Sequence, residues 1–287
     1  MSFNIFDEKL YLEKNPDVKA AIDAKAIKSG LEHFQKYGLT EGRGGVSNYF
    51  DEKLYLEKNP DVASAIEAGK IKSGLQHYIE YGEAEGRSPG AFDEQAYLKL
   101  YPDVAEAVKA GVVSSGLQHY IKYGQNESNR AGVFTGTTGD DTLTAFGSGS
   151  NINYITGVDI SEYETQSDGN LKFKTENYGA GEVDILTGGA GKDLFVVGTS
   201  MQPFGIPQSF YVGGTEENYD YAIIKNFESG KDAISLGGYS SVTYRFESVD
   251  GSLNIFSPDG DVIAKVEGVT SLTQLPSSNS AGTIQLS

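Results

Sequence analysis

Residues 188–196 read Gly-Gly-Ala-Gly-Lys-Asp-Leu-Phe-Val, and this stretch decides the fold of the second part of the chain. It matches the pattern Gly-Gly-x-Gly-x-Asp-x-apolar-x at every fixed position. Glycines let a short turn adopt positive φ and direct its carbonyl oxygens inward, while the aspartate adds a carboxylate. Because hard oxygen ligands favour calcium (Ca2+), Gly188, Gly189, Gly191 and Asp193 are candidate metal-site residues.

Two imperfect copies of this pattern stand upstream. Residues 179–187 keep the first glycine, Asp184 and the apolar residue, but carry Glu182 where the third glycine is expected. Residues 136–144 keep most of the pattern, with a threonine in place of the second glycine. The candidate metal-site residues of this last copy are Gly136, Gly139, Asp140 and Asp141.

Successive nine-residue units turn on opposite sides of a roll, so a complete ion site needs a second turn about eighteen residues away. We expect residues 136–153 to form one coil and residues 179–196 the next, with residues 154–178 as an insertion. Ser150 stands where the first coil needs a carboxylate. The array of complete turns is therefore short.

This arrangement predicts which carboxylates share an ion. Asp141 and Asp184 are expected to face one ion on one side of the roll. Asp193 lies on the other side, where ion binding is expected to be weaker because Ser150 replaces a carboxylate. In a competing interpretation, the Gly-Asp runs are ordinary turns of a β-sandwich that holds no ion. Both interpretations give a β-rich second part, because β-branched and aromatic residues alternate there as half-buried strands require.

The chain after residue 196 also has strand character. Residues 220–236 contain two further candidate metal ligands, Asp220 and Asp232, each near an apolar run. Residues 277–287 are a candidate uncleaved export signal, although a frayed tail has the same composition. Strands are expected over residues 242–246, 253–256 and 262–266, with Asp259-Gly260 as the hairpin turn between the last two.

The first part of the chain is a three-copy repeat. Residues 6–18 read Phe-Asp-Glu-Lys-Leu-Tyr-Leu-Glu-Lys-Asn-Pro-Asp-Val, residues 50–62 are identical to them, and residues 92–104 are a looser version. None of the short helices expected here can bury its apolar face alone, so stacked copies are expected to share one core. The copies span about 4–47, 48–90 and 91–132.

Each copy is expected to hold three short helices. A proline disfavours helical geometry in the residue before it, so it ends one helix and opens the next. A serine followed three residues later by Glu or Gln forms a capping box, and a glycine after the last tyrosine suits a left-handed helix end. The prolines are Pro16, Pro60 and Pro102, the serines Ser29, Ser73 and Ser115, and the glycines Gly38, Gly82 and Gly124.

The three histidines, His33, His77 and His119, share one repeat position. Equivalent positions lie one repeat apart and no second ligand stands at helical spacing, so the histidines are interpreted as packing imidazoles bonded to a backbone carbonyl, in preference to a metal site. Arg43 and Arg87 are interpreted as loop ends, with binding of a glycan or a partner carboxylate as the alternative.

The charge of the chain excludes several classes of protein. The 287 residues carry 40 Asp and Glu against 23 Lys and Arg, a formal charge of -17. Of these, residues 133–287 hold 20 acidic and 7 basic side chains, a net charge of -13. Nucleic-acid binders need a basic surface, so cations are the expected partners. The absence of cysteine excludes disulfides and thiolate metal sites, and no apolar stretch is long enough for a transmembrane segment.

The nine-residue copies, together with residues 220–236, resemble RTX-type (hemolysin-type) calcium-binding repeat proteins. That resemblance implies folding on calcium and type I secretion through a C-terminal signal, with no N-terminal one. The first part resembles the helical repeat of bacterial surface proteins that contains Tyr-Leu-x-x-Asn-Pro-Asp-Val, which implies an accessory or interaction module.

The expected fold class is an α+β multidomain chain. An all-α three-copy helical repeat over residues 1–132 precedes an acidic, calcium-binding domain over residues 133–287. This second domain is expected to be all-β, with a short RTX-like β-roll and a β-rich C-terminal part.

The expected function is that of a secreted calcium-binding structural protein of the cell surface or extracellular matrix, which folds on calcium. Whether it also self-assembles on calcium is left open by the sequence. One alternative is a calcium-dependent adhesin that binds surface polysaccharide, and the other is a polysaccharide-acting enzyme. The known catalytic motifs for zinc, serine and nucleotide chemistry are missing from the sequence, so we expect no enzyme. The insertion is the one place for a sugar-binding groove, and its candidates are Tyr163, Lys172, Lys174 and Tyr178.

Overall fold

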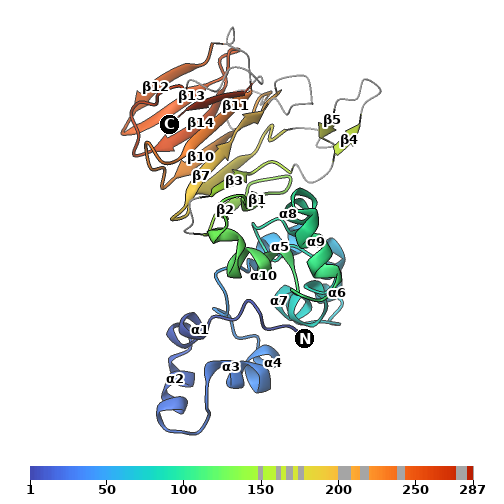
Figure 1. Cartoon of the computed structure of the whole chain (residues 1–287). Coiled ribbons are helices and arrows are strands. Elements are labelled where there is room, and N and C mark those ends of the chain that lie inside the picture. The colour runs from blue at the N-terminus through green and yellow to red at the C-terminus, as the bar shows by residue number, and fades with distance from the viewer. Residues whose placement is uncertain are drawn as a thin grey trace. The chain divides into compact units, whose positions relative to one another are not determined.

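The computed structural model of the chain describes residues 1–147, 151–159, 163–165, 171–173, 178–199, 208–213, 220–237, 243–275 and 283–286. These divide into two compact units, Met1–His119 and Tyr120–Ser287, which we call the repeat unit and the sheet unit. Figure 1 shows helices in the first and mainly strands in the second. Within the described ranges, every helix falls short of the length and hydropathy that a membrane crossing requires.

Two helices separated by one residue open each copy of the repeat. The first is capped by an aspartate side chain that accepts a hydrogen bond from the backbone N–H three residues on. The second begins at the proline, as predicted. These helices are α1 (Glu8–Lys14) and α2 (Pro16–Asp23), α5 (Glu52–Lys58) and α6 (Pro60–Glu67), and α8 (Glu94–Leu100) and α9 (Pro102–Lys109).

A third helical segment closes each copy. The predicted serine caps are confirmed: Ser29, Ser73 and Ser115 each accept a hydrogen bond from the N–H three residues later, at 3.0 Å. The segments are α3 (Gly30–His33), η1 (Phe34–Gly38) and α4 (Leu39–Glu41); α7 (Gly74–His77) and η2 (Tyr78–Gly82); and α10 (Gly116–Lys122) with η3 (Gly124–Asn126).

The glycine after the last tyrosine is needed for another reason than the predicted left-handed helix end. Gly38 has φ of -59°, within the right-handed helical region, so it does not end the helix. A Cβ at Gly38 would instead overlap the Tyr11 hydroxyl and lie 2.8 Å from the Phe34 ring. The glycine therefore gives room to a buried tyrosine, and the left-handed end follows at Gly42, with φ of 71°.

Each copy contains its own aromatic cluster, built on a tyrosine of its first helix. Tyr11 is fully buried and packs against Phe6 and Phe34. Its hydroxyl lies 3.0 Å from His33 Nδ1, and the other copies repeat this contact at 2.9 and 3.0 Å. The histidines are thus packing residues, as interpreted, and each of them bonds to a tyrosine hydroxyl through Nδ1. The equivalent pairs are Tyr55–His77 and Tyr97–His119.

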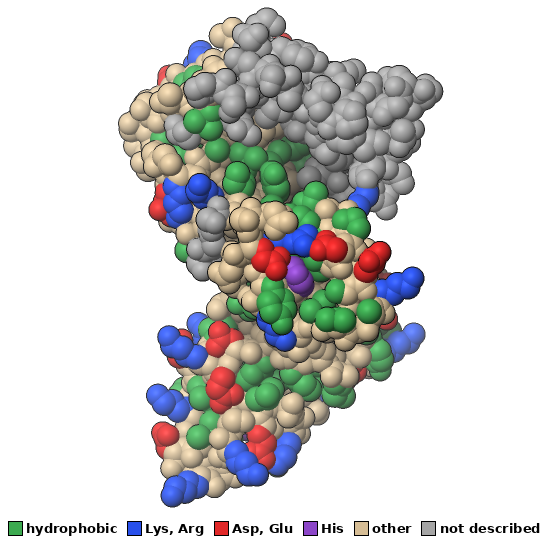
Figure 2. Space-filling model, in the orientation of Figure 1, with side chains coloured by type: hydrophobic (Ala, Val, Ile, Leu, Met, Phe, Trp, Pro, Cys, Tyr) green, Lys and Arg blue, Asp and Glu red, His purple; other side chains and the backbone are tan. Residues whose placement is uncertain are grey.

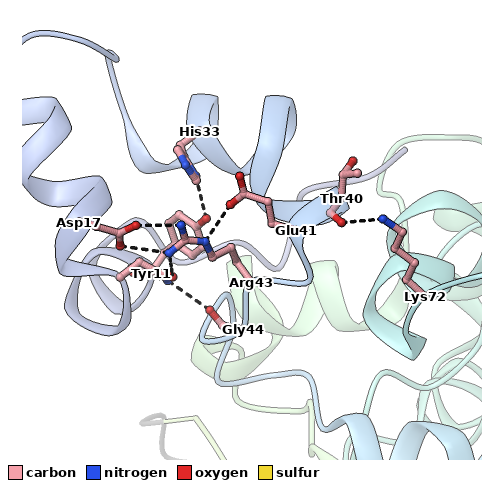
Figure 3. Close-up of polar contacts among 9 residues, drawn as sticks. Tyr11, Asp17, His33, Thr40, Glu41, Arg43, Gly44 and Lys72 are labelled. Atoms are coloured by element: carbon pink, nitrogen blue, oxygen red, sulfur yellow. Dashed lines mark hydrogen bonds and ion pairs between the residues drawn. The ribbon is translucent and has the colours of Figure 1, made fainter.

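The repeat arginines are engaged inside their own copies. Figure 3 shows Arg43 bonded to both carboxylate oxygens of Asp17, at 3.1 and 2.8 Å, and to Glu41. Arg87 makes the same bidentate contact with Asp61. These contacts support the loop-end interpretation. On the face of the repeat unit drawn in Figure 2, basic and acidic side chains are interspersed.

The sheet unit contains two main sheets between which the chain alternates. Sheet A has the order β1-β3-β7-β11-β15, and sheet B has the order β12-β13-β14-β10-β6-β2. Sheet A contains β1 (Val133–Thr135), β3 (Ile152–Thr156), β7 (Lys192–Val196), β11 (Ala233–Gly237) and β15 (Thr283–Leu286). Sheet B contains β2 (Thr142–Thr144), β6 (Val183–Thr187), β10 (Tyr221–Lys225), β12 (Arg245–Val249), β13 (Ser252–Phe256) and β14 (Val262–Glu267).

Neighbouring strands are parallel in the centre of both sheets and antiparallel towards one edge. Both sheets contribute apolar side chains to a buried core, and five fully buried ones are Phe134, Leu186, Phe195, Ile224 and Ile234. Two small hairpins, β4–β5 (Tyr163–Thr165, Leu171–Phe173) and β8–β9 (Gly198–Thr199, Gln208–Ser209), stand outside these sheets.

The expected fold class, an all-α repeat followed by an all-β short roll, is wrong. The chain is a mixed α/β structure, and its second compact unit begins at Tyr120, inside a helix. Tyr120 is buried against Phe134 and Phe146, and its hydroxyl donates to Asn153 Oδ1 at 2.6 Å. The end of α10 and helix η3 thus belong with the sheets, and the division lies N-terminal to the expected boundary at residue 132.

The expected coils are also corrected. Residues 220–236 extend the coils: β10 pairs with β6 and β11 pairs with β7, so this segment continues the alternation between the sheets. Ser150 lies outside the described residues, and Asn153 takes the position opposite Asp193. The hairpin of β13 and β14 around Asp259-Gly260 is confirmed. The strand expected over residues 242–246 instead covers Arg245–Val249, and residue 242 lies outside the described residues.

Candidate metal centre

Asp141 and Asp184 lie side by side where the chain enters sheet B. Parallel pairing of β2 with β6 sets Thr142 opposite Ile185, so the two preceding aspartates are neighbours. Both are buried, with 2% and 0% of their surface exposed. The Asp141 N–H donates to Asp184 Oδ1 at 2.8 Å, and Asp141 Oδ2 accepts from the Thr137 N–H at 2.6 Å. The structure thus brings together the two carboxylates that the sequence paired.

A tyrosine that the sequence did not single out completes this cluster. The Tyr211 hydroxyl donates to Asp184 Oδ2 at 2.6 Å and is fully buried. Burial raises the pKa of Asp184 to about 7, the hydrogen bond from Tyr211 counteracts this rise, and the charges of Asp141 and Glu182 add to it. Protein donors therefore already surround both oxygens of Asp184.

Glycines make room for the carboxylates of these turns. A Cβ at Gly136 would overlap the carbonyl oxygen of Gly157 and lie 2.5 Å from Asp141 Oδ2. A Cβ at Gly157 would overlap Asp184 Oδ2, and one at Gly188 would lie 2.9 Å from Asp193 Oδ2. At Gly136 and Gly188 the first glycine of the pattern is thus needed because the aspartate five residues later folds back beneath it.

On the opposite side, where the chain enters sheet A, Asn153, Asp193 and Asp232 form a row across β3, β7 and β11. The Asn153 side-chain amide donates to Asp193 Oδ1 at 3.0 Å, and the Asp193 N–H donates to Asp232 Oδ1 at 3.0 Å. Asp232 Oδ2 accepts from the Glu228 N–H at 2.9 Å. Asp193 and Asp232 are each 1% exposed.

The second oxygen of Asp193 differs from the other carboxylate oxygens of this row. Asp193 Oδ2 is buried and has no hydrogen-bond partner among the residues that the structure describes. Burial raises the pKa of Asp193 to about 6, while the Asn153 amide and the Gly189 backbone N–H oppose this rise and the Asp232 charge adds to it. Burial also raises the pKa of Asp232. A buried carboxylate oxygen without a donor is costly unless a cation or a proton compensates it.

The remaining predicted site residues lie around these two rows. Asp140 is exposed, and its Oδ1 accepts from the Val183 N–H at 2.7 Å. Gly139 has φ of 115°, as the turn requires, and Gly189 lies where a Cβ would stand 3.0 Å from the Ala145 carbonyl oxygen. Gly191 is buried at the end of its turn, and Asp220 is buried beside Glu182.

Three of the four candidate residues in the insertion lie in the part of the chain that the structure describes. Tyr163 and Lys172 lie on the strands of the β4–β5 hairpin, while Lys174 lies outside the described residues. Tyr178 stacks on Phe210 with ring centroids 6.1 Å apart, and its carbonyl oxygen accepts from the Tyr211 N–H at 2.8 Å. Tyr178 therefore helps to position Tyr211 for its contact with Asp184.

Among the described residues, no group of three or more His, Cys, Asp or Glu side chains is arranged to hold a metal ion. Any ion here has to draw most of its ligands from backbone carbonyl oxygens, as calcium does in many proteins. In comparisons with known proteins, no protein-family model matches the chain and no curated protein is significantly similar to it.

Proposed function

We propose that the chain is a secreted calcium-binding structural protein of the cell surface or extracellular matrix, stabilised by an ion beside Asp193 and Asp232. The observation that carries this proposal is the buried Asp193 Oδ2, which lacks a hydrogen-bond donor in the described part of the chain. The nine-residue motif around Asp193, which resembles RTX-type calcium-binding repeats, points to the same residue.

The residues around Asp193 fit a calcium ion. The carboxylate of Asp232 lies on the adjacent strand, and the carbonyl oxygens of Gly188, Gly189 and Ala190 belong to the same turn as Asp193. All three carbonyls accept hydrogen bonds from side chains of residues 226–232, so these oxygens face the next turn. Calcium accepts about six to eight oxygen ligands and tolerates irregular geometry, which suits such a mixture.

The charge of residues 133–287, the larger part of the sheet unit, gives calcium a second role. Residues 133–287 carry 20 acidic and 7 basic side chains, and their mutual repulsion opposes a compact state. An ion that binds only the folded turns removes part of this repulsion and stabilises the fold by mass action. Extracellular calcium sites have dissociation constants of about 10⁻⁴ to 10⁻³ M, so such a site fills outside the cell.

Calcium titration of the chelated protein tests the proposal. We expect the thermal midpoint of the sheet unit, followed by circular dichroism, to rise with calcium and to be half-maximal at about 10⁻⁴ to 10⁻³ M. Asp193→Asn should abolish most of the rise, while Asp259→Asn, which changes an exposed carboxylate in the turn between β13 and β14, should preserve it. An unchanged midpoint in the native protein would sink the proposal. Light scattering in the same titration tests self-assembly, since assembly requires the particle size to grow.

A second candidate function, glycan adhesion, is favoured by exposed aromatic rings on the repeat unit. Tyr37 and Tyr81 occupy the same repeat position and are 52% and 53% exposed. Each lies against a histidine ring, with centroids 5.7 Å apart. If these rings bind sugars by stacking, Tyr37→Ala/Tyr81→Ala should abolish retention on immobilised polysaccharide and leave the calcium titration unchanged. Equal retention of the double variant and the native protein would rule this function out.

A further inference from the structure

We infer that Lys231 is a tethered cation that competes with calcium for the oxygen ligands between residues 188–193 and 226–232. This inference rests on the proposed function and deepens it, because it names a residue that lowers the calcium affinity of that site. We call the two segments the Asp193 turn and the Asp232 turn. Lys231 would stabilise the pair of turns without metal and weaken binding of the ion.

The contacts of Lys231 join the two turns directly. Its Nζ donates to the carbonyl oxygen of Ala190 in the Asp193 turn at 2.8 Å. The same Nζ donates to Glu228 Oε1 in its own turn at 2.6 Å. The Lys231 side chain is 32% exposed, so it bridges the two turns at the surface of the protein.

The ligands held by Lys231 are of the type that calcium uses. An ammonium group and a calcium ion both bind carbonyl and carboxylate oxygens, and one oxygen cannot fully serve both cations. The ammonium also lies within the electrostatic reach of the two buried aspartates, since Asp232 and Asp193 both act on Lys231 in addition to its hydrogen bond with Glu228. Calcium that takes the Ala190 carbonyl therefore has to displace Lys231.

The chain offers a matched control for this lysine. Gly191-Lys192-Asp193 and Gly230-Lys231-Asp232 have the same motif, so Lys192 and Lys231 hold equivalent positions one coil apart. Lys192 is exposed at the start of β7, and no hydrogen bond or ion pair is found for its side chain among the described residues. Replacing either lysine removes one positive charge near Asp193 or Asp232, but only Lys231 bridges two turns.

Calcium affinity and metal-free stability, measured on the full-length chain, test the inference together. Lys231→Met should bind calcium about five- to tenfold more tightly by calorimetry, because one charge-assisted competitor is lost. In chelator, the same variant should unfold at a lower urea concentration than the native protein. Lys192→Met should match the native protein in both measurements.

Three outcomes separate the two proposals. Tighter calcium binding with lower metal-free stability, confined to Lys231→Met, supports the competition. Equal calcium affinity of the native protein and Lys231→Met overturns the competition and leaves calcium binding intact. If the native protein binds no calcium, the proposed function itself fails and the competition fails with it.

Discussion

Replacing Gly136 with alanine is expected to destabilise the sheet unit by about 3 kcal/mol or more, because the new methyl group has no space. Its Cβ would overlap the carbonyl oxygen of Gly157, which is backbone, and would approach Asp141 Oδ2 to 2.5 Å. A flexible side chain can rotate away from such an overlap, but a backbone carbonyl held beside a strand moves only with that strand. Urea unfolding followed by circular dichroism measures the loss.

A matched glycine replacement separates the overlap from the general effect of alanine. Gly44 has no atom within 4 Å of its would-be Cβ, and its φ lies outside the left-handed region. Gly44→Ala should therefore change the free energy of unfolding by less than about 0.5 kcal/mol. If Gly136→Ala unfolds at the same urea concentration as the native protein, the close approach of the two turns at Gly136 is wrong.

The stability of the repeat unit is expected to fall as the pH rises from about 5 to 8, because of one buried carboxyl. Glu94 is 1% exposed, and burial raises its pKa from 4.5 to about 7. Its oxygens accept the N–H groups of Gly116 and Leu117, at 2.5 and 2.8 Å, which counteracts burial only in part.

The sign of this effect follows from proton binding. Between pH 4.5 and 7 the folded chain keeps the proton on Glu94 while the unfolded chain has released it, so raising the pH favours unfolding. The loss is complete above the folded pKa and amounts to roughly 2.5 kcal/mol between pH 5 and pH 8.

The Glu94→Gln variant isolates this contribution. Urea unfolding is measured at pH 5, 6, 7 and 8 by the circular dichroism of the helices. The free energy of unfolding of the native protein should fall with pH, and Glu94→Gln should reduce this slope. Glu52→Gln changes the equivalent helix-capping carboxylate in the second copy, where the side chain is exposed, and should keep the slope of the native protein. Parallel pH profiles for native protein and Glu94→Gln would contradict the assignment.

Local spacing predicted much of both units. Three predicted features depend on contacts within a few residues, so a short segment of sequence is enough to predict them. They are the helix starts at the prolines, the serine caps, and the need for a glycine five residues before Asp193. The neighbouring positions of Asp141 and Asp184 also followed, because the nine-residue period sets which strands pair.

Contacts between distant residues were not predictable in this way. Tyr211 reaches Asp184 from a loop without any motif, and Lys231 looks identical to Lys192 in its local sequence. Tyr120 follows a histidine just as Tyr78 does, but it also packs on Phe134 and Phe146 of the sheet unit. No pattern within the repeat distinguishes these cases.

By itself the sequence determined that a three-copy helical repeat precedes an acidic, glycine-rich part with aspartates at the ends of its turns, since these features depend on local backbone preferences and on period. Only the tertiary structure decided that the sheet unit begins at Tyr120, and that Asn153, Tyr211 and Lys231 serve the buried aspartates. The physical reason is that a buried carboxylate needs hydrogen-bond donors or a cation. Tertiary packing, and not local sequence, determines which side chain lies close enough to supply them.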